Sequence, residues 1–252
     1  MGKYAGRSAP AAVMAVSACV IALSGCELSG NQAVGHVGRL AVAEQFLLNG
    51  NYDKAYALLD AVTEDRSQSA KVWLDVGDLY LRNTAFLKAE RAYIKAGEAG
   101  DEVGSRLGLG RVSLARNDHA DAVAHFDAVL QRDPQNARAL NGLGVAADLR
   151  GAHFEAQQHY RRAYRMDSSN LDPLNNLGLS LILGGNADAG VSVLTDVARS
   201  NRDDAVTRQN LALAYALIGR RDDALRLARL DVGDTESIEM IEAVSNYRTT
   251  RN

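Results

Sequence analysis

A hydrophobic pattern that recurs at intervals of about 34 residues constrains the fold of this chain more than any other feature. Within residues 137–170, apolar and small residues form two stripes at helical spacing, with a turn between them. The pair Leu143 and Gly144 returns one full period later as Leu177 and Gly178. Each period is therefore expected to form two amphipathic helices joined by a turn, so the repeat defines the architecture.

Six such units fill residues 36–231, although the register slips by a single position between the second and third units, as Gly77 and Gly110 show. After the sixth unit, residues 236–247 predict one solvated capping helix with Ile238, Ile241 and Val244 on its inner side. No unit can bury its apolar faces alone, so stacked neighbours must supply the core. We expect the array to span 36–231, and the capping helix and tail to span 232–252.

The second unit carries aromatic and small residues at spacings typical of a known repeat: Trp73, Gly77, Tyr80, Ala89, Tyr93 and Ala96. These residues resemble the tetratricopeptide repeat. The resemblance implies an all-α fold, a right-handed superhelical array of six helix pairs followed by a C-terminal capping helix. Arg39, Arg106 and Arg208 stand where the repeat has an aromatic residue or leucine, and only the third unit has the terminal proline, Pro134. These departures weaken single units of the pattern.

Residues 1–25 have the composition of a secretory signal peptide. Lys3 and Arg7 precede an apolar run over residues 11–23, which is shorter than the roughly 18 residues that a transmembrane helix needs. The run ends in Leu-Ser-Gly before Cys26, which resembles the lipobox of bacterial lipoproteins. An ordinary cleaved signal that ends near a cysteine is the alternative.

The lipobox resemblance implies that Cys26 is acylated and becomes the first residue of a lipid-anchored protein. Glu27 follows it, whereas inner-membrane lipoproteins typically have aspartate there, so we expect an outer-membrane protein on the periplasmic face. Residues 26–35 are expected to form a short tether. Cys19 would be removed with the signal, so no disulfide is expected in the mature chain.

The charge balance argues against nucleic acid as a partner. The chain has 28 basic and 31 acidic residues, a formal net charge of -3, and no basic run that would neutralise a row of phosphates. The Gly-Leu-Gly segments near residues 108 and 142 do not continue into phosphate-binding motifs. We expect no cofactor.

The histidines do not predict a metal site or a catalytic site. His119 and His153 are separated by one period, as are His125 and His159, so each pair occupies one repeat position and is expected to face outward. Zinc would need converging ligands at helical spacing or cysteine pairs. With the remaining cysteine acylated, no nucleophile is evident, so we expect a protein that is not an enzyme.

The first helix of each unit predicts a protein-binding groove. The positions rotated away from the packed stripe should face the concave side, where amides alternate with aliphatic residues. Carboxamides can bond an extended backbone while the aliphatic residues contact its side chains. The alternative is that these amides bond only neighbouring backbone. The predicted groove residues are Arg138, Asn141, Val145, Asp172, Asn175, Asn176, Leu179, Gln209, Asn210 and Leu213.

The lipobox, the six repeats and the Arg-Gln-Asn-containing stretch 208–219 together resemble the TadD family of tight-adherence (Flp) pilus lipoproteins. The resemblance implies a pilotin-like scaffold at the outer membrane, with the secretin or another pilus-assembly component as its protein partner. A scaffold lipoprotein of another envelope or type IV pilus assembly system would share every feature except that stretch. An enzyme of the cell wall is the third alternative and would need a catalytic carboxylate in a cleft.

Overall fold

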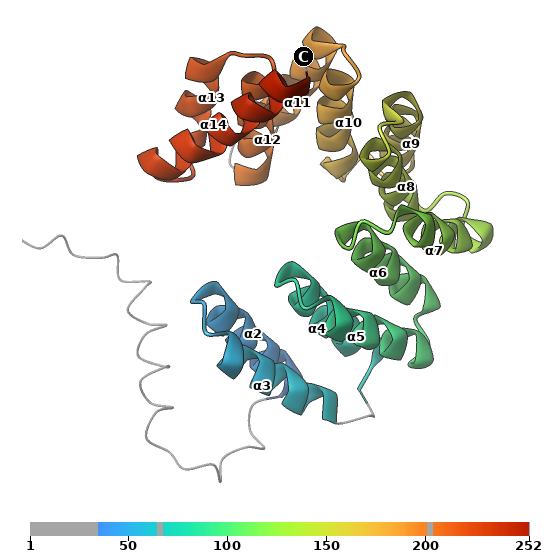
Figure 1. The fold of residues 1–252 in the computed structure, drawn as a ribbon. Coiled ribbons are helices and arrows are strands. Elements are labelled where there is room, and N and C mark those ends of the chain that lie inside the picture. Colours follow the sequence, from blue (N-terminus) through green and yellow to red (C-terminus); the bar gives the residue numbers. More distant parts are fainter. Residues whose placement is uncertain (1–34, 65–67, 201–203, 252) are drawn as a thin grey trace, which may run out of the picture. The chain divides into compact units, whose positions relative to one another are not determined.

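The computed structural model describes residues 35–64, 68–200 and 204–251, and within these ranges every regular element is an α-helix (Figure 1). The predicted signal peptide and nearly all of the predicted tether lie outside the described residues. None of the described helices is long and apolar enough to span a membrane. The chain divides into two compact units, with the boundary between residues 66 and 67.

The first unit contains one helix pair, α2 (His36–Leu48) and α3 (Tyr52–Glu64), which pack against each other. Gly50 in the turn has a φ of 71°, a left-handed conformation that glycine adopts without a steric penalty. The interface consists of residues spaced three or four apart on each helix, as expected for amphipathic helices. Its buried residues are Leu40, Ala43, Leu47, Ala55, Leu59 and Val62.

The second unit contains five further helix pairs and a C-terminal helix. The pairs are α4 (Ala70–Arg82) with α5 (Phe86–Glu98), α6 (Glu102–Ala115) with α7 (His119–Arg132), α8 (Ala137–Leu149) with α9 (His153–Met166), α10 (Asp172–Leu183) with α11 (Ala187–Ser200), and α12 (Ala205–Leu217) with α13 (Arg221–Ala228). The final helix is α14 (Asp234–Arg251).

Each helix of this unit packs against the next one, and the first helix of a pair also packs against the first helix of the following pair. The contacts α4–α6, α6–α8, α8–α10 and α10–α12 therefore place the first helices in one continuous row. Together with α2 and α3, the described residues contain the six helix pairs that the sequence predicts. The prediction of an all-α array of tetratricopeptide-like helix pairs is confirmed.

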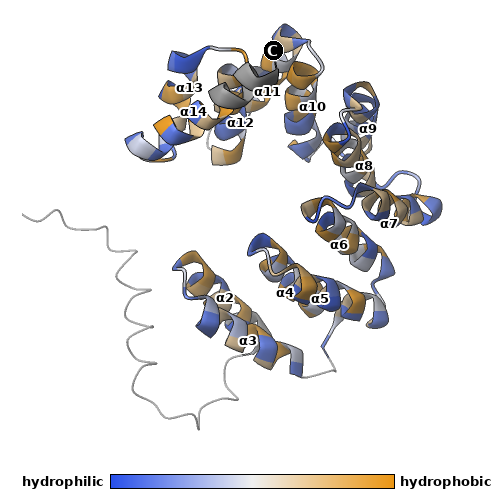
Figure 2. Cartoon of the chain, in the orientation of Figure 1, coloured by the Kyte–Doolittle hydropathy of each residue, from blue (hydrophilic) through white to orange (hydrophobic). Residues whose placement is uncertain are grey.

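Large rings fit against glycines both within a helix pair and between successive pairs. A β-carbon on Gly110 would lie 2.6 Å from the Phe126 ring, and one on Gly142 would lie 2.4 Å from it. Real β-carbons do not approach so closely, so the ring occupies space that only glycine leaves open. The helices carry both apolar and polar residues (Figure 2). Four aromatic side chains of these helices are buried: Tyr80, Tyr93, Phe126 and Tyr160.

The C-terminal helix α14 covers the last helix pair, and it contacts both α12 and α13. Ile241 is fully buried, while Ile238 and Val244 are half-buried in the same cluster as Ala224 and Leu225. The three predicted inner residues therefore do face the array, and the helix is longer than the predicted 236–247. The predicted capping helix is confirmed.

Candidate protein-binding site

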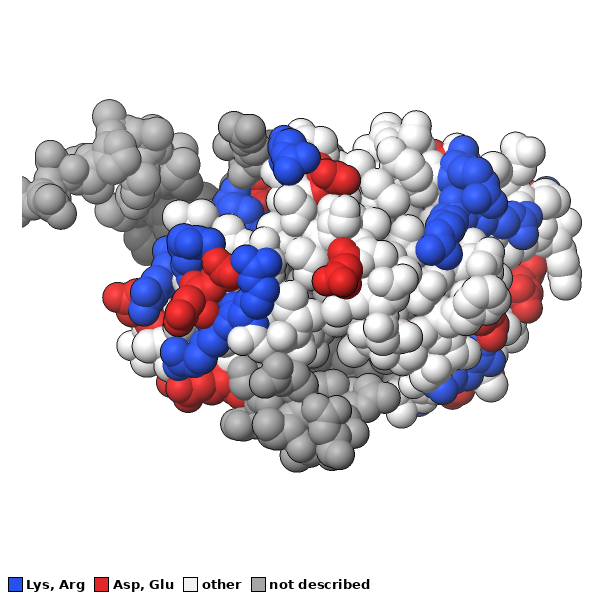
Figure 3. All heavy atoms as spheres, turned by 90° about the horizontal axis from the view of Figure 1, so that it is seen from above, with Lys and Arg blue, Asp and Glu red and all other residues white. Residues whose placement is uncertain are grey.

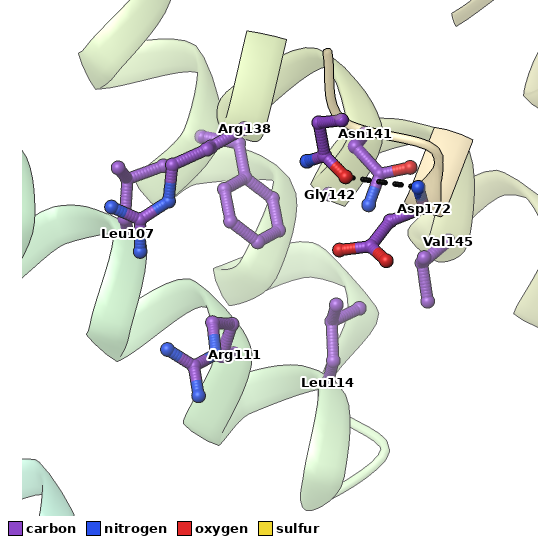
Figure 4. Close-up of a pocket in the computed structure, with 10 residues that line it drawn as sticks. Leu107, Arg111, Leu114, Arg138, Asn141, Gly142, Val145 and Asp172 are labelled. Carbon is purple, nitrogen blue, oxygen red and sulfur yellow. Dashed lines mark hydrogen bonds between the residues drawn. The ribbon is translucent and has the colours of Figure 1, made fainter. Parts of the chain in front are cut away.

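A cavity of about 440 Å³ lies within the second unit, where α6, α8 and the start of α10 meet. Helix α6 contributes Leu107, Arg111 and Leu114, which are three or four residues apart and so share one face. The other lining residues are Phe126, Arg138, Asn141, Gly142, Val145, Asn170 and Asp172 (Figure 4). We call this space the α6–α8 cavity.

Local hydrogen bonds fix the helix ends that position these side chains. The Asn136 side chain accepts a hydrogen bond from the backbone nitrogen of Ala139 at 3.0 Å, which caps the start of α8 just before Arg138. At the start of α10, the backbone nitrogen of Asp172 donates to Oδ1 of Asn170 at 2.9 Å. These bonds place Arg138 and Asp172 at the first turns of their helices, beside the cavity.

Four of the ten predicted groove residues line the α6–α8 cavity: Arg138, Asn141, Val145 and Asp172. Asn176 lies beside them, because its Nδ2 donates to Oδ1 of Asn141 at 3.0 Å. This bond joins α8 to α10 through the side-chain oxygen of Asn141, so the Asn141 amide nitrogen takes no part in it. The register of the repeat therefore brings half of the predicted residues to one place.

The other predicted residues lie elsewhere. Leu179 packs against the core cluster that includes Leu194 and Leu211, between α10, α11 and α12. The three predicted residues on α12 are half-buried and do not line the α6–α8 cavity: Gln209, Asn210 and Leu213.

The placement of Asn175 on an accessible groove is wrong. Its side chain is 5% exposed, and its Oδ1 has no hydrogen-bond partner among the described residues. Helix α10 therefore differs from α8 at this point, where Asn141 and Asn176 are half-buried while Asn175 is buried. The polar row consequently continues from Asn141 to Asn176, one position later than the repeat register indicates.

Two of the three charged groups that the cavity brings together have no partner in the described part of the chain. Nη1 of Arg111 lies 2.9 Å from Oδ1 of Asp78, so this guanidinium is paired. The Arg138 guanidinium and the Asp172 carboxylate form no ion pair or hydrogen bond within the described ranges. Figure 4 shows Arg111 and Arg138 on one side of the cavity and Asp172 on the other.

A second, smaller cavity of about 190 Å³ adjoins the first, because Arg111 and Arg138 line both. It extends along α4, where Lys71 and Asp75 form an ion pair of 2.9 Å. The Tyr93 hydroxyl donates to Oδ1 of Asp78 at 2.5 Å. Burial, and then this hydrogen bond, raise the pKa of Tyr93 well above its usual value.

Asp148, also on α8, joins three helices. Its carboxylate accepts hydrogen bonds from the Tyr160 hydroxyl at 2.9 Å and from the Ser180 hydroxyl at 2.7 Å. Nδ1 of His153 lies 2.9 Å from the same carboxylate. Its side chain is 16% exposed, so it holds α8, α9 and α10 together instead of facing a partner.

The prediction that the histidines face outward is wrong for His119, His125, His153 and His159, all of which are half-buried. Helix α7 packs against both α6 and α8, and α9 packs against both α8 and α10, so these second helices are covered on two sides. Burial lowers the pKa of His125 and His159. Within the described ranges, no three His, Cys, Asp or Glu side chains are grouped so as to hold a metal ion.

The surface charges do not form one continuous field on the face drawn in Figure 3. Basic and acidic side chains there lie in separate groups with uncharged surface between them. Several of the arginines are paired, for example Arg150 with Glu155 at 3.1 Å and Arg221 with Glu242 at 3.2 Å.

Residues 107–170 match the tetratricopeptide repeat model, a segment that spans α6 to α9. No curated protein sequence matches the chain. Stacked repeats of this kind are short structural units that form extended binding surfaces. The match covers three of the four helices that surround the α6–α8 cavity.

Several solved structures are similar in fold. A tetratricopeptide repeat protein of Parabacteroides merdae has a TM-score of 0.58 at 13% identity, covering 86% of this chain and 88% of that one. A thermophilic protein of the same type from Thermus thermophilus has a TM-score of 0.60 at 14% identity, covering 71% and 98%. PilF of Pseudomonas aeruginosa has a TM-score of 0.53 at 16% identity, covering 81% and 96%. The helix pairs, the central repeat match and these similar structures together identify the fold as a tetratricopeptide-like array, a scaffold suited to binding other proteins.

Proposed function

We propose that this chain is a non-catalytic scaffold that binds a segment of another protein in the α6–α8 cavity. The cavity itself carries the proposal, because its wall combines apolar side chains with an unpaired cation, an unpaired anion and an amide. Binding sites of this kind use apolar contacts for affinity and a few polar groups for orientation. The cavity lies on the row of first helices, which continues along the unit and offers a longer surface for the same partner.

We further propose that the scaffold is anchored by lipid on Cys26 to the periplasmic face of the outer membrane. Its partner there would be the secretin, or another component, of a tight-adherence (Flp) pilus assembly system. The support for this part is the sequence alone: the Leu-Ser-Gly-Cys26 motif, Glu27 after it, and the resemblance of residues 208–219 to TadD. The function is then pilotin-like, because the lipid holds the array at the membrane while the cavity engages the assembling component.

The anchoring part is tested by Cys26→Ala in cells, with fractionation of the envelope and quantification of secretin multimers. Loss of the acylated sulfur should move the protein out of the outer-membrane fraction and reduce the multimers assembled there. The control is Cys19→Ala, which alters the cysteine that would be discarded with the signal. Normal multimers at their normal position with Cys26→Ala would contradict the pilotin-like role.

The binding part is tested by chemical crosslinking in envelope membranes followed by affinity capture of the chain. We expect the double variant Asn141→Ala and Val145→Ala to capture less partner, because it removes one amide and one aliphatic surface from the cavity. The matched control is Gln158→Ala on α9, an exposed amide that does not line the cavity. Equal capture by the double variant, with both proteins equally helical by circular dichroism, would place the binding surface elsewhere.

A further inference from the structure

The α6–α8 cavity is electrically polarised. Arg138 projects from the first turn of α8 on one side, and Asp172 projects from the first turn of α10 on the other. Both side chains are exposed, and neither has an ion-pair partner in the described part of the chain. The same cavity is lined by the apolar side chains of Leu114, Val145 and Phe126.

Arg111 does not add a second free cation at this end of the cavity. Asp78 accepts its hydrogen bond at 2.9 Å and also accepts one from the Tyr93 hydroxyl at 2.5 Å. The Asp78 carboxylate therefore neutralises Arg111 and holds its guanidinium in place. A carboxylate that enters the cavity from this side meets the unpaired charge of Arg138.

We propose that the segment bound in the cavity is an internal stretch of a partner protein with a fixed charge order. It has an acidic side chain opposite Arg138, a bulky apolar side chain inserted among Leu114, Val145 and Phe126, and a basic side chain opposite Asp172. This proposal rests on the proposed protein-binding function and specifies the chemistry of its partner. Charges that complement one another across an interface fix register and exclude wrong partners.

The same charges disfavour a free carboxyl terminus whose last residue is acidic. A chain terminus with an acidic last residue brings two negative charges close together, whereas the cavity offers one unpaired cation and places the Asp172 carboxylate on its other side. Like charges in such an interface oppose binding. An internal segment with one charge of each sign meets a complementary group at both ends.

The experiment is a selection of displayed random twelve-residue peptides against the full chain, purified in detergent and immobilised. The same library is selected against the chain with Arg138→Glu and Asp172→Lys, which exchanges the two charges. An unrelated helical repeat protein serves as the control surface. Enriched peptides are then synthesised with free and with capped ends, and their Kd values are measured by fluorescence anisotropy at low and high salt.

We expect the natural chain to enrich peptides with an acidic residue, an apolar residue and a basic residue in one order. The charge-exchanged chain should enrich the reverse order. Neutralising one partner charge of a winning peptide should weaken binding by about two- to fivefold, the effect of an exposed ion pair, and less at high salt. Capping the ends should leave Kd unchanged.

Three results would overturn the proposal. Enriched peptides that show no charge order, or the same order for both chains, would remove the charge recognition while leaving the protein-binding function intact. Enrichment that depends on a free terminal carboxylate would show that the cavity binds chain ends. The absence of enrichment over the control surface would show that the cavity does not bind linear segments, and capture of a partner from membranes would then have to involve a folded surface.

Discussion

The contact between Phe126 and Gly142 should be the tightest coupling in the wall of the α6–α8 cavity. The Phe126 side chain is 1% exposed and packs in a cluster with Leu107 and Leu143. Replacing it by alanine should reduce the free energy of unfolding by about 3–5 kcal/mol, because it removes buried surface and leaves a void. A β-carbon at Gly142 would lie 2.4 Å from Cζ of this ring, so Gly142→Ala alone should cost about 1–3 kcal/mol through overpacking.

In the Phe126→Ala background the sign of the second change should reverse. The ring is then absent, the added methyl group enters the void, and alanine is favoured over glycine inside a helix by about 1 kcal/mol. The helix-propensity gain is the same in both backgrounds and cancels, so the coupling between the two sites equals the overpacking cost, about 1–3 kcal/mol. The assay is guanidinium unfolding of the four proteins, followed by circular dichroism. If Gly142→Ala lowered the midpoint equally with and without the ring, the packing described for this interface would be wrong.

Other predictions follow from single contacts. Burial raises the pKa values of the Tyr93 and Tyr160 hydroxyls, so absorbance at 295 nm should show them still protonated at the pH at which other tyrosines ionise. Each Tyr→Phe variant should lose part of the absorbance change seen at higher pH. Burial lowers the pKa of His125 and His159, so the unfolded chain takes up protons before the folded chain as the pH falls. Tm should therefore be constant above about pH 6.5 and fall below it, and the fall should be less steep in the His→Gln variants. Asp204 caps α12, so Asp204→Ala should cost about 0.5–2 kcal/mol in urea unfolding and Asp204→Asn much less.

The fold was predictable because its determinants are local and repeat. A glycine in the first helix and a ring in the second, as with Gly144 and Tyr160, recur at nearly constant spacing and fix how the two helices of a pair pack. The repeat spacing is one residue shorter between the pairs α4–α5 and α6–α7. This does not disturb the packing, since Gly77 and Gly108 both approach the ring of Tyr93. The capping helix followed from the same apolar periodicity.

The site was only partly predictable, because it depends on which polar groups satisfy one another. The register indicates that Arg138 and Asn141 lie on one face. It does not indicate that Arg111 pairs with Asp78, which lies on α4 in the preceding helix pair. The buried position of Asn175 does not follow from the register, because Asn141 at the matching position of α8 is only half-buried. Leu107 and Leu114 were missed, although their spacing around Arg111 was a usable signal.

The histidines show the same limit. Their repetition indicates a shared environment for His125 and His159, and the structure does give both a half-buried position with a lowered pKa. Periodicity alone does not distinguish a solvent-facing position from one that lies beside the first helix of the next pair. The packing of neighbouring pairs decides between them.

The most direct measurement of the central claim is site-specific photocrosslinking in living cells. A photoreactive phenylalanine analogue placed at Asp172, an exposed residue that lines the α6–α8 cavity, should form a covalent adduct with a single partner protein under illumination. The same analogue at Gln158, which is exposed on α9 and does not line the cavity, should not. Adducts at Gln158 with none at Asp172 would contradict the claim that this cavity is where the scaffold binds its partner.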